Sequence, residues 1–168
     1  MIVDFTNIPD GTSVSQGNLY AGILYLEAIT GNYPWSTGIV SDGTLEVQAQ
    51  PMQTPPPPFV YQSHLTGVFL QPVTDVTLVV KCWRNASCSY QGVDKKGVGF
   101  NTSGLVIPGM IDGNPPPLPP GWVTVRLTIP TDGHLVSFHI GNRDDGNNAN
   151  GAFWLKSISF HHTLHGHR

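Results

Sequence analysis

Two short stretches of the sequence place a tryptophan and a cationic side chain at alternating positions. Lys81 and Trp83 alternate with apolar residues in the first stretch, and Trp122 and Arg126 do so in the second. Successive side chains of a β-strand point to opposite faces, so each pair is expected on the face opposite its apolar neighbours. Flat aromatic rings can cover the C–H face of a sugar while a few polar groups bind its hydroxyls. This combination favours a saccharide site.

A histidine extends the same pattern. His139 lies between Phe138 and Ile140 and is expected to point away from them. If the strands present one common face, the ligand-binding residues are Lys81, Trp83, Trp122, Arg126 and His139. The alternative is that the tryptophans cap the rim of the core or fill space under a loop, as large aromatic residues often do. Trp154, inside an apolar stretch, is assigned to the core.

The loop 142–151 is rich in short side chains that carry oxygen. Asp144, Asp145 and Asn147 are its candidate metal ligands, since calcium prefers such hard ligands. The spacing does not follow the EF-hand pattern, and the same residues are ordinary in a plain hairpin loop. We therefore expect that no cofactor is required, although Ca²⁺ could bind here.

Motifs of catalysis are missing from the sequence. It contains no Gly-x-Ser-x-Gly, no His-Glu-x-x-His and no phosphate-binding loop. A glycosidase or lyase is the remaining enzymatic alternative, because its carboxylates can converge from distant strands. The candidates for that role are Asp4, Glu27, Glu46, Asp75, Asp94 and Asp112.

The composition indicates one domain with many turns. The chain has 168 residues, 19 glycines and 15 prolines, and only 11% of its residues are charged, against roughly 25% in an average soluble protein. We expect a single domain over 1–160 and a flexible, histidine-rich tail over 161–168. The 8 Lys and Arg residues form no basic run, which argues against a nucleic-acid partner.

The sequence shows no pattern for membrane insertion or targeting. No run of about 18 apolar residues occurs, so no membrane span is expected. The first residues lack the pattern of a signal peptide. The compartment is left undecided, with an extracellular or cell-surface location favoured.

Period-two alternation of apolar residues predicts several short strands. It is clearest at 45–50, 76–83, 123–129, 136–140 and 153–160. The turn at 131–133 suggests that 122–141 forms a hairpin. The prolines at 55–58 and 115–120 cannot donate to a sheet and predict loops. An all-β, antiparallel sandwich follows from these patterns.

The only two cysteines, Cys82 and Cys88, are six positions apart. In an oxidising compartment they could close a strand-turn-strand hairpin through a disulfide. In a reducing cell Cys82 would fill space in the core as a thiol.

Both ends of the chain resemble known modules. The opening residues 3–12, VDFTNIPDGT, and the closing segments 136–142, VSFHIGN, and 153–160, FWLKSISF, are similar to jelly-roll carbohydrate-binding and galactose-binding-like modules. The resemblance implies a jelly-roll sandwich in which the first and last strands lie side by side. Such modules often carry an acidic residue in the last strand, where this chain has 156–159, KSIS, which argues against a structural calcium tied to that strand.

These observations together predict a non-catalytic, lectin-like module that binds a glycan. The alternative is a structural or interaction protein, such as a virion, adhesin or toxin-associated module, whose exposed aromatic residues contact another protein or a second copy. A homo-oligomer is also compatible with the glycan-binding hypothesis, because repeated sites raise the avidity of weak sugar binding.

Overall fold

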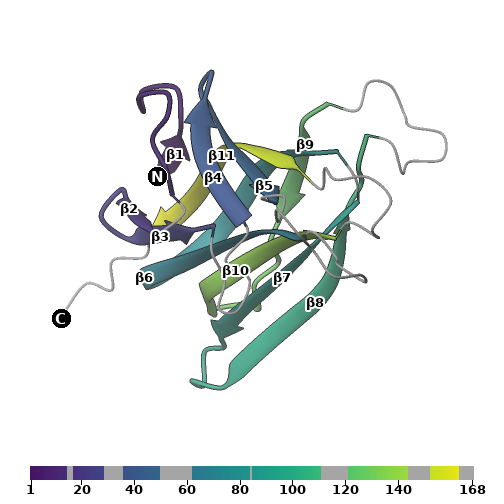
Figure 1. The fold of residues 1–168 in the computed structure, drawn as a ribbon. Coiled ribbons are helices and arrows are strands. Elements are labelled where there is room, and N and C mark those ends of the chain that lie inside the picture. The colour runs from purple at the N-terminus through teal and green to yellow at the C-terminus, as the bar shows by residue number, and fades with distance from the viewer. Residues whose placement is uncertain are drawn as a thin grey trace.

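The computed structural model describes residues 1–14, 17–28, 36–49, 62–83, 85–110, 121–143 and 152–162. Every regular element among them is a β-strand (Figure 1), which confirms the predicted all-β fold. No helix long and apolar enough to cross a membrane occurs in these ranges. The strands are β1 (Ile2–Asp4), β2 (Asn18–Tyr20), β3 (Leu24–Glu27), β4 (Ser36–Ser41), β5 (Thr44–Ala49), β6 (Gln62–Cys82), β7 (Ala86–Val93), β8 (Gly99–Ile107), β9 (Val123–Arg126), β10 (His134–Arg143) and β11 (Phe153–His162).

The strands form one antiparallel sheet that curls around a core. Its main order is β4-β5-β11-β6-β10-β7-β8, with β1 beside β11, β2 beside β3, and both β3 and β9 beside β6. The long strand β6 serves both layers of the resulting sandwich (Figure 1). Its first half pairs with β3 and β10, and its second half pairs with β9 and β11.

A bend in β6 lets both halves face the same core. Residues that point inward have odd numbers from Ser63 to Phe69 and again at Val73, and even numbers from Val76 to Cys82. Asp75, between these runs, has a φ of 54°. An irregular residue in a strand shifts the side-chain alternation by one position, so the bend keeps apolar residues inside on both sides of it.

The core lies between the inner faces of the two halves. Removing these side chains from water is the main favourable contribution to folding. Its largest fully buried members include Phe5, Leu26, Leu45, Leu65, Leu78, Phe138, Ile140, Phe153 and Leu155.

The two ends of the chain lie side by side, as the resemblance implied. β1 pairs with β11, with Ile2 opposite Ser159. The backbone N–H of Phe160 donates to the carbonyl of Met1 over 2.9 Å. The strands predicted at 45–50 and 153–160 are also confirmed, as β5 and β11.

The predicted hairpin over 122–141 is wrong. β9 pairs with β6, where Val123 lies opposite Val80, while β10 pairs with the other half of β6 and with β7. The turn at 131–133 therefore carries the chain from one layer to the other. Alternation identifies a strand and its inward face, but it does not identify the strand's partner.

Cys82 and Cys88 are buried, free thiols. The strands that hold them do not form a hairpin, because β10 lies between β6 and β7 in the sheet. Burial raises the pKa of both thiols to about 12, and for Cys82 the neighbouring Cys88 adds to the rise. A thiol with such a pKa is unreactive near neutral pH, and both residues act as apolar filling.

Several predictions fall outside the described residues. These are the two proline loops, the candidate calcium ligands Asp144, Asp145 and Asn147, and the tail beyond 162. The last strand extends to His162, two residues into the segment assigned to the tail.

Candidate functional site

Aromatic and cationic side chains gather on the outer face of the layer that contains the second half of β6. Trp154 on β11 lies opposite Lys81 on β6, and Trp122 immediately precedes β9 on the other side of Lys81. Lys156 follows on β11 and is exposed, whereas Lys81 and both tryptophans are half-buried. We call the surface formed by Trp122, Lys81, Trp154 and Lys156 the tryptophan face.

The Lys81 ammonium group stands between the two indole rings. Its Nζ is 5.0 Å from the ring centroid of Trp122 and 4.9 Å from that of Trp154. The Nζ of Lys156 is 5.7 Å from the Trp122 centroid. Cations within about 6 Å of an aromatic centroid are attracted to the ring face. Lys81 is therefore attracted to both rings, and Lys156 to that of Trp122.

The spacing of the two tryptophans follows from the sheet. Their backbones are separated by one intervening strand, β6, and neighbouring strands lie about 4.8 Å apart. The two indoles are thus anchored about 10 Å apart. This is close to the length of a disaccharide.

A polar groove continues the tryptophan face towards β4 and β5. Glu46 on β5 lies opposite Trp154, so it shares the row of the tryptophans. The groove has a volume of about 280 Å³. It is lined by Thr37, Ile39, Ser41, Glu46 and Gln48. These hydroxyl, amide and carboxylate groups can donate to and accept from a ligand, and Glu46 was predicted only as a candidate for catalysis.

The structure brings together some of the predicted site residues. Lys81 and Trp122 meet on the tryptophan face, and exposed Arg126 lies on the same outer surface, opposite Thr77. Trp83 follows β6, is 37% exposed, and its backbone N–H donates to Ala152 over 3.0 Å.

The assignment of Trp154 to the core is wrong. Its neighbours Phe153 and Leu155 are fully buried, while Trp154 points outward and lies under the Lys81 ammonium. The sequence contained the signal at this point, because a residue that lies between two inward-pointing neighbours in a strand must point outward.

The chain matches no protein-family model and no curated protein sequence. Its fold, however, is similar to that of a family 29 carbohydrate-binding module from Piromyces equi. The TM-score is 0.50 at 12% identity, and the match covers 100% of this chain and 95% of that one. A second family 29 module gives 0.49 at 10% identity over 96% and 87% of the two chains. A variant of a family 29 module gives 0.47 at 11% over 96% and 89%. The predicted resemblance to carbohydrate-binding modules is confirmed at the level of fold.

His139 lies apart from the tryptophan face of this module-like fold. It is on β10, which pairs with the first half of β6 and with β7, in the other layer. There its Nε2 is 2.9 Å from Nδ1 of His64, and the two ring centroids are 5.0 Å apart. Glu27 lies on the same outer face, since it and His139 both pair with Thr66.

The histidine pair is expected to make stability depend on pH. Burial, and then the neighbouring His139, lowers the pKa of His64 from 6.5 to about 4, and burial lowers the pKa of His139. Between pH 6.5 and 4 the unfolded chain then binds more protons than the folded one. Stability is fully present above pH 6.5 and is lost as pH falls towards 4. Urea midpoints measured at pH 7.5, 6, 5 and 4 test this.

A His64→Gln variant is the control for this dependence. It removes one imidazole and keeps a hydrogen-bonding group next to His139. The fall in urea midpoint between pH 6.5 and 4 should become shallower in the variant. An identical fall in both proteins would assign the pH dependence to other groups.

The described carboxylates among the candidates for catalysis lie on separate elements. Asp4 accepts from Thr6, and Asp94 accepts from the backbone N–H groups of Lys96 and Val98 in a turn. Glu46 lines the groove beside the tryptophan face, and Asp112 lies outside the described residues. Among the residues that the structure describes, no three His, Cys, Asp or Glu side chains could hold a metal ion together.

Proposed function

We propose that this chain is a non-catalytic, lectin-like module that binds a glycan on the tryptophan face. The observation that carries the proposal is the pair of half-buried indoles, Trp122 and Trp154, held by Lys81 on one outer surface. The similarity in fold to a carbohydrate-binding module supports it.

The chemistry of the face suits a short oligosaccharide. Each indole offers apolar area to the C–H face of a sugar ring, and the two are anchored about 10 Å apart, so one chain can reach both. Lys81 and Lys156 supply hydrogen-bond donors beside the rings. Glu46 and Gln48 in the adjoining groove supply acceptors and further donors.

Other predicted residues have different places in this proposal. Trp83 follows Lys81 at the end of β6 and would extend the site beyond that strand. His139, in the other layer, is left out of it. Calcium is not needed by the proposed contacts, and an extracellular or cell-surface location, where glycans are abundant, remains our proposal for the compartment.

A glycan array tests the function. The purified protein is applied with Ca²⁺ and, separately, with EDTA, together with a Trp122→Ala variant. We expect binding to a group of related oligosaccharides, unchanged by EDTA and abolished by the substitution. Calcium-dependent binding would instead point to the loop 142–151.

A matched control separates a lost site from a lost fold. Val106 on β8 is 61% exposed and belongs to the other layer, so Val106→Ala should bind as the natural protein does. A Trp122→Ala variant that still binds the same glycans would refute this site.

One observation favours the interaction-protein alternative. β8 ends the strand order as an edge strand, and exposed Val98 and Val106 lie just before it and near its end. Open edges with apolar side chains can pair with another chain. A blank array combined with a dimer mass in light scattering, reduced by Val106→Lys, would support this alternative.

A further inference from the structure

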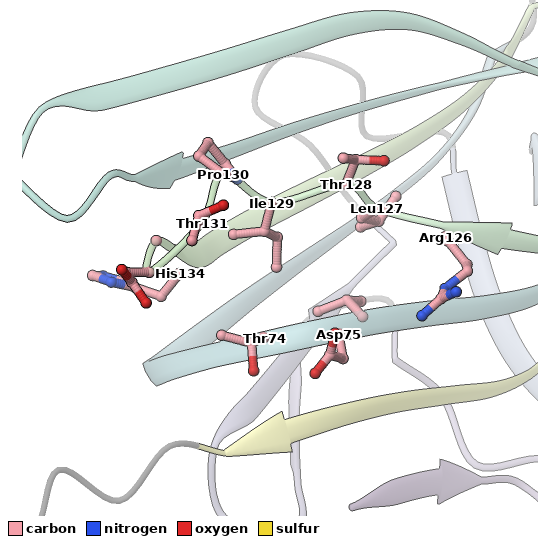
Figure 2. Close-up of a pocket in the computed structure, with 12 residues that line it drawn as sticks. Thr74, Asp75, Arg126, Leu127, Thr128, Ile129, Pro130, Thr131 and His134 are labelled. Carbon is pink, nitrogen blue, oxygen red and sulfur yellow. The ribbon is translucent and has the colours of Figure 1, made fainter.

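A second cavity opens at the bend of β6, away from the indole rings. Its volume is about 640 Å³, within the usual range of roughly 300–1,000 Å³ for small-molecule sites. One wall is the bend itself, from Thr74 to Val76, and the other runs from Arg126, at the end of β9, to His134, at the start of β10 (Figure 2).

The cavity is lined by polar side chains that have no hydrogen-bonding partner in the part of the chain that the structure describes. Figure 2 shows the Arg126 guanidinium extending from β9 towards β6, with Thr131 and His134 at the opposite end. Among the described residues, none of the polar lining side chains forms a hydrogen bond or ion pair with another residue. They are Thr74, Asp75, Arg126, Thr128, Thr131, Asp132 and His134.

Backbone contacts hold the shape of the cavity without using these side chains. The N–H of Leu127 donates to the Val76 carbonyl over 3.0 Å, which ties the two walls together. The N–H of Gly133 donates to the Pro130 carbonyl over 2.8 Å and closes the turn. The polar groups are therefore presented on a fixed frame.

Both carboxylates come from residues with left-handed backbone. Asp75 has a φ of 54° and Asp132 a φ of 61°. Aspartate adopts this conformation more readily than most residues other than glycine, because its short polar side chain can hydrogen-bond locally. The bend and the turn therefore place one carboxylate on each wall of the cavity.

We propose that this cavity is a second saccharide site, which takes one neutral sugar ring. Arg126 donates, the two carboxylates accept, and the threonine hydroxyls do both, which matches hydroxyl groups that themselves donate and accept. Ile129, which is half-buried, supplies apolar contact for the ring. The site shares the ligand class of the proposed function but uses none of the residues of the tryptophan face.

Charge argues for a neutral ligand. The lining holds one guanidinium and two carboxylates, so an anion would be repelled by Asp75 and Asp132. A metal ion is disfavoured as well, because no described group of three suitable ligands occurs. A polyhydroxylated ring satisfies these groups without leaving an unpaired charge.

Nuclear magnetic resonance titration tests the second site separately from the first. Glucose, galactose, mannose and xylose are added at millimolar concentration to labelled protein. We expect shifts of the backbone amides at 74–76 and 127–134. These shifts should persist in Trp122→Ala. In Asp75→Asn they should need roughly tenfold more sugar, because a hydrogen bond to a charged acceptor is stronger than one to a neutral amide.

Asparagine is the matched substitution because it has the same size and tolerates left-handed backbone. Asp132→Asn provides an independent second variant on the other wall. Shifts confined to the indole N–H groups of Trp122 and Trp154 would overturn the second site and leave the proposed function standing. Shifts confined to the cavity would establish the second site and leave the tryptophan face to the oligosaccharide array. A spectrum unchanged by all four sugars would overturn the second site alone.

Discussion

Replacing Trp154 with alanine is expected to weaken glycan binding at least tenfold while the domain stays folded. The side chain points outward between two buried neighbours, so its removal opens no cavity in the core. Stacking of an aromatic ring contributes about 0.5–1.5 kcal/mol beyond the area it buries. Adding the lost apolar contact brings the total above the 1.4 kcal/mol that corresponds to tenfold. Isothermal titration with the best oligosaccharide from the array measures the change.

Two further variants make this result specific. Lys81→Met keeps the length of the side chain but removes the charge that stands over both indoles, and it should weaken binding less than either tryptophan substitution. Val106→Ala, an exposed substitution in the other layer, is the control and should bind with unchanged affinity. Unchanged affinity in Trp154→Ala would show that Trp154 does not contact the ligand. A large drop in the Tm of this variant would show that the Trp154 side chain is part of the core.

The alternation of side chains made much of the fold predictable. It located strands such as β5 and β11 and showed which residues of each point inward. Trp154 was assigned to the core because it lies inside an apolar stretch, and that assignment was wrong. The local pattern was the better guide, because Phe153 and Leu155 fix the face of the residue between them.

The arrangement of the layers was not predictable in the same way. A single strand, β6, supplies both layers, and the inward positions change from odd to even at Asp75. Nothing in local alternation tells which strand lies beside which, since partners are set by contacts between distant parts of the chain. Hence Lys81 and Trp122 were correctly placed on one face, whereas His139 was grouped with them although it lies in the other layer.

The histidine pair and the cavity were missed for a related reason. His64 and His139 are 75 positions apart in sequence and meet only through the register of β6 and β10. The cavity depends on a bend at Asp75 and a turn at Asp132, and both residues have left-handed backbone. In the sequence, the only signal for this conformation is the residue type, aspartate. Both features are products of tertiary structure.

Introducing a single methyl group at Gly67 is expected to destabilise the domain by about 1–3 kcal/mol, the usual cost of overpacking a core. Gly67 on β6 lies opposite Phe138 on β10. A Cβ at this position would stand 2.2 Å from a carbon of the Phe138 ring, and that ring is 1% exposed, so it has no free space to enter. Urea unfolding of Gly67→Ala measures the loss.

Gly99→Ala is the matched control, because a Cβ there would meet nothing closer than a backbone oxygen at 3.9 Å and the residue also lies in a strand. Its stability should stay close to that of the natural protein.

The substitution Phe138→Leu should partly rescue Gly67→Ala. A smaller side chain leaves room for the added methyl group, so the double variant Gly67→Ala, Phe138→Leu should be more stable than the sum of the two single losses predicts. Additive losses would show that the ring of Phe138 is not what Gly67 accommodates.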